Sequence, residues 1–104
     1  MKGEQTMNKN ILKDALNKLV EDFNSYSELV ALNYANGENK GKDWNWHNDG
    51  VLQWNRGSLN KTEEYLKSLA EAMGVSLCWD CSEHDFGHDD WKQKLTYKTV
   101  KIAD

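Results

Sequence analysis

The stretch that decides the predicted fold lies near the middle of the chain and reads Asp43-Trp44-Asn45-Trp46-His47-Asn48-Asp49-Gly50-Val51-Leu52-Gln53-Trp54. Within it, Asn48-Asp49-Gly50 separates two short runs that alternate in polarity, a pattern typical of a β-hairpin. A three-residue loop with Gly50 at positive φ places Trp44 opposite Trp54, whereas a two-residue loop divides the apolar residues between the two faces. We therefore predict an aromatic hairpin over residues 43–55, with its three tryptophans on one face.

The segment before this hairpin has the spacing of an amphipathic helix. Apolar residues recur every three or four positions between Ile11 and Phe23, with charged residues on the opposite face. We predict a helix there, capped by Asn8 or Asn10, after a frayed leader over residues 1–7.

Two further segments favour helices, one on each side of the hairpin. Residues 25–36 begin with the capping-box pattern Ser25-x-x-Glu28, but apolar residues in this segment also alternate as in a strand. Helix is the favoured interpretation there, and a strand stays open. Residues 60–73 have helical spacing that begins with the cap residue Asn60 and ends before Gly74.

The last third of the chain predicts two strands. Apolar and polar residues alternate from Val75 to Asp80, and again from Trp91 to Ile102 with a phase change that indicates a bulge. Together with the hairpin, these strands predict one small α+β domain over residues 8–104. Its mostly antiparallel, four-stranded sheet is expected to carry the helices on its aromatic face.

Composition restricts the classes of protein to which the chain can belong. With 104 residues, 38% of them hydrophobic, the chain is long enough for one domain with one core. No apolar run approaches the roughly 18 residues of a membrane span, and the first residues lack the apolar segment of a signal peptide. Because there is no export signal and the only cysteines lie three positions apart, we expect a reducing, cytoplasmic setting. Because there is no apolar span, we expect no membrane partner.

The net charge of −4 is unevenly distributed along the chain. Residues 43–90 carry ten acids against three bases, whereas residues 91–104 carry four lysines. An acidic middle argues against direct binding of nucleic acid, which needs Lys and Arg to neutralise phosphates. It suits a partner with a basic surface, or no more than a solvated face.

The strongest candidate for a metal site is a group of four ligand-type residues within eleven positions: Cys78, Cys81, His84 and His88. Zinc prefers four such ligands in a tetrahedron, and Cys-x-x-Cys commonly supplies two of them. The two residues between the second cysteine and the first histidine leave a cramped loop, because ordinary Cys₂His₂ sites separate their pairs by about a dozen residues. A structural zinc is therefore a possible cofactor, with two ordinary thiols as the alternative, and no other cofactor is predicted.

The favoured function is that of a small acidic interaction protein without enzymatic activity. We expect it to bind a basic surface on a larger protein, such as a nucleic-acid enzyme, by competing with the nucleic acid. The residues expected to contact the partner are the acids Asp80, Glu83, Asp85, Asp89 and Asp90, with any exposed member of Trp44, Trp46 and Trp54 as the anchor. By analogy of size and charge alone, inhibitors from phages and mobile elements, such as anti-CRISPR, anti-restriction and immunity proteins, work in this way.

Two other functions stay open at this stage. One is a zinc-stabilised binding module built on the Cys/His loop over residues 78–88. The other is a metal-dependent hydrolase that uses Asp85, Asp89 or His88 in acid–base chemistry. The simplest role of the tryptophans is the core face of the sheet, and the sequence leaves the oligomeric state open.

Overall fold

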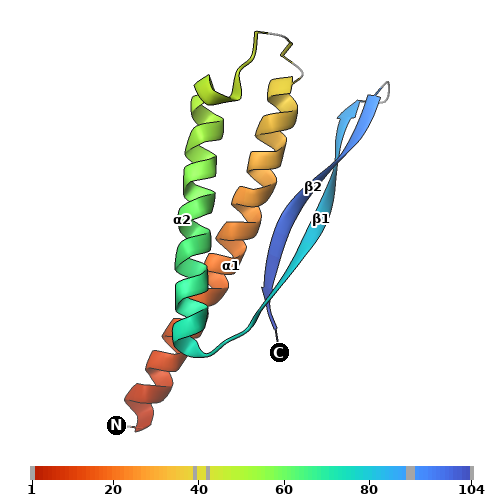
Figure 1. Ribbon diagram of the computed structural model, residues 1–104. Coiled ribbons are helices and arrows are strands. Elements are labelled where there is room, and N and C mark those ends of the chain that lie inside the picture. Colours follow the sequence, from red (N-terminus) through yellow and green to blue (C-terminus); the bar gives the residue numbers. More distant parts are fainter. Residues whose placement is uncertain (1, 39, 42, 89–90, 104) are drawn as a thin grey trace.

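The computed structural model describes the backbone of residues 2–38, 40–41, 43–88 and 91–103, and the side chains of residues 10–38, 40–41, 43–83 and 95–103. Its elements in chain order are α1 (Lys2–Glu38), the short 3-10 helix η1 (Trp46–Asn48), α2 (Gly50–Met73), β1 (Leu77–His88) and β2 (Trp91–Ile102). The two helices form an antiparallel hairpin, and the two strands form a twisted ribbon that lies beside α1 (Figure 1). The α+β class is confirmed, but the predicted four-stranded sheet is wrong, because the described strands form one two-stranded antiparallel sheet.

The predicted aromatic hairpin over residues 43–55 is also wrong. Asn48-Asp49-Gly50 starts a helix instead of a β-turn, because Asp49 Oδ1 accepts a hydrogen bond from Leu52 N at 3.1 Å and so caps α2. An Asn-Asp-Gly sequence suits both structures, and here the helix continues through Gly57 and Asn60 to Met73. The predicted helix over residues 60–73 thus lies within α2, but its predicted cap is an interior residue.

Helix α1 is continuous where two helices were predicted. Residues 25–36 are helical, as favoured, but Ser25 lies inside α1 and does not begin a new helix. Asn8 and Asn10 were predicted to cap the first helix. Both lie inside α1, so neither caps its start. Gly74 ends α2 as predicted, since it adopts φ +68° and its N–H donates to the carbonyl oxygens of Ala70 and Glu71.

The main core joins both helices to the ribbon. Five side chains form its buried centre: Leu16 and Phe23 of α1, Leu66 and Ala70 of α2, and Val100 of β2. The half-buried ring of Trp79 from β1 packs edge-on against Phe23, with centroids 5.4 Å apart. Burial of a large apolar side chain contributes about 1.5–3 kcal/mol, so this cluster fixes the ribbon on the helical hairpin.

The ribbon pairs without the predicted bulge. Its register runs unbroken from Leu77 opposite Ile102 to His88 opposite Trp91. Tyr97 and Val100, which lie on opposite faces of β2, nevertheless both contact the helical hairpin: Tyr97 Oη donates to Glu28 Oε2 at 2.8 Å, and Val100 is buried in the core. The strong twist of a two-stranded ribbon turns first one face and then the other toward α1, and Figure 1 shows the strands crossing. The phase change in the sequence therefore reflects twist.

No helix in the described part of the chain combines the length and the apolar character that a membrane span requires.

Candidate functional site

The loop between the helices holds two of the three predicted anchor tryptophans, and it uses them structurally. Trp44 is half-buried against Gly37, where an added Cβ would overlap the indole ring. Its Nε1 donates to Asp49 Oδ2 at 3.0 Å. This bond and a second from Leu52 N hold the pKa of Asp49 below its ordinary value. Trp44 therefore supports the cap of α2 and is not an exposed anchor.

Trp46 also contacts neighbouring residues of the same region. Its half-buried ring lies 3.6 Å from the ring of His47, centroid to centroid, and 4.8 Å from the Arg56 guanidinium carbon. Gln53 Nε2 donates to the Trp46 carbonyl oxygen at 2.9 Å. Of the three predicted anchors, only Trp54, with 75% of its surface exposed, remains available to a partner.

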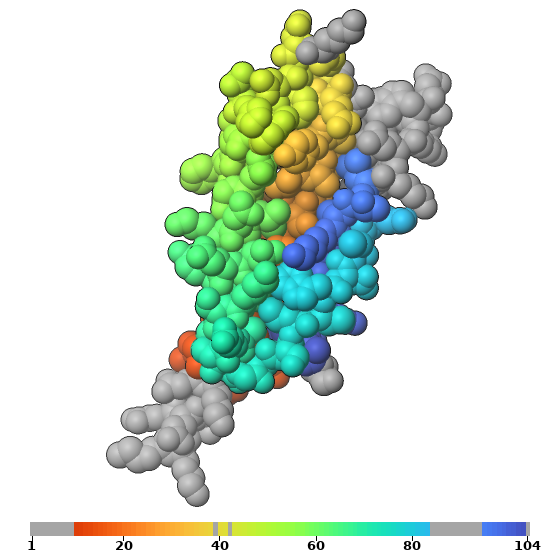
Figure 2. Space-filling view, viewed as in Figure 1, coloured from red at the N-terminus to blue at the C-terminus, as the bar shows by residue number. Residues whose placement is uncertain are grey.

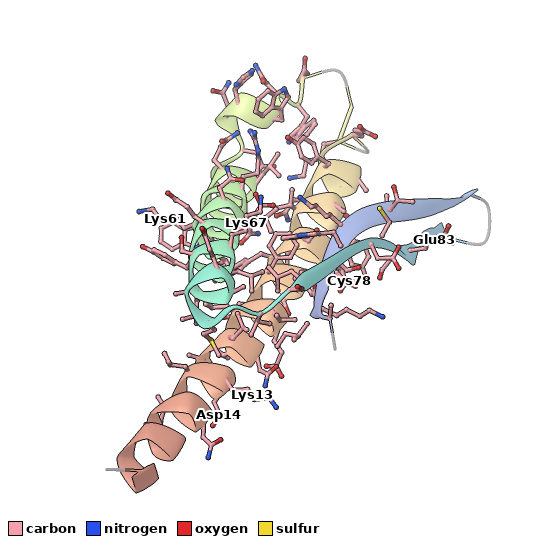
Figure 3. All side chains as sticks on the ribbon, turned by 60° about the horizontal axis from the view of Figure 1, so that its bottom comes forward. Lys13, Asp14, Lys61, Lys67, Cys78 and Glu83 are labelled. Atoms are coloured by element: carbon pink, nitrogen blue, oxygen red, sulfur yellow. The ribbon has the colours of Figure 1, made fainter. Side chains whose placement is uncertain are left out.

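Three of the acids predicted to contact the partner lie on the outer strand, β1. Asp80 and Glu83 are exposed on β1, opposite Thr99 and Thr96 of β2. Asp85 is opposite Lys94, and both of these side chains lie outside the described set. Asp89 and Asp90 lie outside the described residues altogether. Figure 3 shows Glu83 far out along the ribbon, away from both helices.

The two cysteines of the predicted zinc site do not form the expected Cys-x-x-Cys loop. Cys78 and Cys81 are free thiols on a regular strand, half-buried and exposed respectively, and their odd spacing places them on opposite faces. His84 pairs with Leu95 further along β1, roughly 20 Å from Cys78 at about 3.3 Å per residue. Among residues with described side chains, no group of three His, Cys, Asp or Glu is placed to hold a metal ion. Since the side chains of both histidines are outside that set, the zinc site stays a prediction.

The two outer edges of the ribbon differ in what they meet. On β2, the side-chain amide of Asn24 in α1 bonds the backbone of Val100 twice: Oδ1 accepts from Val100 N at 2.8 Å, and Nδ2 donates to the Val100 carbonyl oxygen at 2.9 Å. An amide side chain thus takes the place of a neighbouring strand and closes this edge. Sequence reasoning missed Asn24, because nothing local marks a partner 76 positions away.

The Asn24 contact also shows which backbone groups of β1 point outward. Because both backbone groups of Val100 face α1, the pair Trp79–Val100 belongs to the non-hydrogen-bonded phase of the antiparallel ladder. Trp79 and Cys81 therefore direct their N–H and C=O groups away from β2. The hydrogen bond from Cys81 N to Asp80 Oδ1, 2.8 Å long, agrees with this phase. In the described part of the chain, no other strand pairs with this outer edge of β1.

Polar contacts fix the ribbon in this orientation. Lys98 Nζ of β2 lies 3.0 Å from Glu63 Oε1 of α2, and Lys67 Nζ lies 3.4 Å from Glu63 Oε2. Partial burial alone would raise the pKa of Glu63, but the two lysines prevail and hold it below its ordinary value. The hydrogen bond to Glu28 raises the pKa of Tyr97, because it stabilises the protonated phenol. These contacts hold β2 on the helices and leave β1 outermost.

Comparisons with protein-family models, with characterised proteins and with solved structures found no match to this chain. Its function is therefore argued from its own surfaces.

Proposed function

We propose that this chain is a non-enzymatic interaction protein whose outer strand β1 binds an extended, basic segment of a larger protein. The observation that carries the proposal is the difference between the two ribbon edges. Asn24 closes β2 at Val100, whereas the outward backbone groups of Trp79 face no strand in the described chain. Such an edge accepts an added strand through main-chain hydrogen bonds.

Charge selects the kind of strand that fits. Asp80 and Glu83 are both exposed and, being an odd number of positions apart, occupy opposite faces of β1. An added strand with Lys or Arg on both faces meets an acid on either side. A second copy of β1 would instead bring acids close to acids, which destabilises a strand pair.

A protein that normally binds nucleic acid is the partner class that best supplies such a segment, because its binding surface is rich in Lys and Arg. Occupation of that surface by β1 would exclude the nucleic acid, so the chain would act as an inhibitor in the cytoplasm. This proposal rests on the acids of β1, which also disfavour direct contact with phosphates.

The test uses a fluorescent peptide with the repeat Lys-Lys-Val-Val, which carries lysines on both faces of an extended strand. The peptide is titrated with the protein and its binding is followed by fluorescence anisotropy. We expect binding that weakens as salt is added, and a roughly tenfold loss of affinity in the double variant Asp80→Asn/Glu83→Gln. The matched control is Glu64→Gln/Glu71→Gln, which removes the same charge from exposed positions of α2. Equal affinities for the two double variants, or no binding at low salt, would overturn the proposal.

A further inference from the structure

A second surface lies on the face of the helical hairpin that the ribbon leaves uncovered. Asn24 and Glu28 of α1 face β2, and Asp22 and Tyr26 are each two positions from one of them. Since successive helical residues are about 100° apart, these two residues lie about 160° around α1 from the ribbon. In Figure 3, Lys61 likewise points from α2 away from the ribbon.

A groove of about 480 Å³ runs between the two helices on this face. Its lining includes Asp22 and Tyr26 from α1 and Trp54, Gly57 and Lys61 from α2. At Gly57 a Cβ atom would meet nothing within 4 Å, so the groove is open above the helix backbone there. Trp54 stands at the same groove with 75% of its surface exposed.

We propose that a second copy of this chain occupies the groove, so that Trp54 of each copy enters the space beside Gly57 of the other. A projecting ring and an open slot on one face are what a two-fold, self-complementary contact needs. The groove lining also includes one acid and one base, Asp22 and Lys61. In a two-fold contact the acid of each copy can face the base of the other. Two helical hairpins joined in this way form a four-helix arrangement.

The groove differs in charge from the edge of β1, so the two surfaces are expected to bind different partners. Asp22 is paired within its own helix to Lys18, whose Nζ lies 3.1 Å from Asp22 Oδ1, and Lys61 adds a further positive charge. A basic segment therefore finds no excess of acid here, whereas an uncharged aromatic ring finds Tyr26 and Trp54. Exposed aromatic residues of this size are typical anchors of protein interfaces.

The experiment is sedimentation velocity on the full chain over a wide range of protein concentration. We expect a reversible dimer whose dissociation constant rises about tenfold or more in Trp54→Ala. Gly57→Leu is the sharper variant, because it fills the slot while replacing a residue that weakens a helix interior. It should dissociate the dimer with no loss of thermal stability. Leu12→Ala is the control, because Leu12 is an exposed apolar side chain of α1 that lies outside the groove lining, about 15 Å along the helix from Asp22.

Charge reversal tests the orientation of the two copies. Lys61→Asp and Asp22→Lys should each weaken the dimer, and the double variant should restore it, because the opposed pair is then rebuilt with its signs exchanged. A chain that stays monomeric at every concentration, or a dimer that Trp54→Ala and Gly57→Leu leave unchanged, would overturn the proposal. Binding of the basic peptide by β1 should be the same in all of these variants, so the two proposals fail independently.

Discussion

Strands β1 and β2 have the same length and pair along all of it, yet they meet different surroundings. β2 buries Leu95 and Val100, bonds α1 through Asn24 and Tyr97, and reaches Glu63 of α2 through Lys98. β1 packs the half-buried Leu77 and Trp79 against the core but exposes Asp80, Cys81 and Glu83. Figure 2 shows this part of β1 at the surface beside β2.

The difference separates stability from recognition within one small sheet. Removal of the side chain of Leu95, Tyr97 or Val100 from β2 takes away buried or half-buried contacts. The same operation on the exposed part of β1 changes mainly what a partner would meet. The variants below test this division, from the largest expected effect to the smallest.

Val100→Ala should have the largest effect, because Val100 is only 3% exposed at the centre of the core. Loss of its two methyl groups, together with the cavity left behind, should lower the free energy of unfolding by about 2 kcal/mol. Cys81→Ala, the comparison on β1, should stay within about 0.5 kcal/mol of the wild type. Urea denaturation followed by tryptophan fluorescence measures both, and equal losses would contradict the division.

Asn24→Ala should cost about 1–2 kcal/mol, since it leaves the N–H and C=O of Val100 without their partner. Asn24→Asp sharpens the test, because a carboxylate accepts from Val100 N but cannot donate to the carbonyl oxygen. Its stability, from the same urea experiment, should lie between those of Asn24→Ala and the wild type. If Asn24→Ala unfolds at the wild-type urea concentration, the edge of β2 is not held closed by this side chain.

Cys81→Pro should act on recognition and leave the fold intact. Cys81 N points away from β2, so a proline there removes no bond of the ladder and is a residue that edge strands tolerate. Its ring should nevertheless block an added strand and weaken binding of the Lys–Val peptide by about tenfold. Circular dichroism serves as the control for folding, and unchanged affinity in a folded Cys81→Pro variant would argue against strand addition.

The smallest effect is expected from pH, through the contact that ties β2 to α2. Because Lys98 and Lys67 lower the pKa of Glu63 in the folded chain, the stability from this group is present above the unfolded pKa of about 4.3 and is lost as pH falls through the folded value. Glu63→Gln should thus lower Tm slightly at pH 7 and leave it unchanged near pH 2. A Tm difference between the two proteins that persists at low pH would assign the effect to packing.

The sequence predicted the start of β1 and the course of β2, because alternation over Leu77–Asp80 and Leu95–Ile102 has no helical counterpart. It was wrong for residues 81–88, which were expected in a Cys/His loop and instead continue β1. It failed at residues 48–55, where Asn-Asp-Gly suits both a hairpin turn and a helix start and the flanking runs are too short to decide. A longer pattern could have decided it: Leu52, Leu59 and Leu66 recur every seven positions, and Leu52 and Leu66 are fully buried.

The candidate site was less predictable than the fold. The exposure of Asp80 and Glu83 could be expected from their charge, but Glu83 was expected in a loop and lies on β1. That their strand would be the open one depends on Asn24, and that Trp54 would be exposed depends on where α2 begins. The open edge of β1 and the exposure of Trp54 both depend on packing between residues far apart in the sequence, which a local sequence pattern does not reveal.

The most direct test of strand addition is amide hydrogen exchange, read from ¹H–¹⁵N spectra with and without the Lys–Val peptide. At saturation, the amide of Trp79 should exchange at least about tenfold more slowly, because it would donate to the added strand. The amide of Val100, already bonded to Asn24, should exchange at its original rate unless the whole chain is stabilised. If the peptide binds and Trp79 exchanges as fast as before, β1 is not the binding edge and the proposed function is wrong.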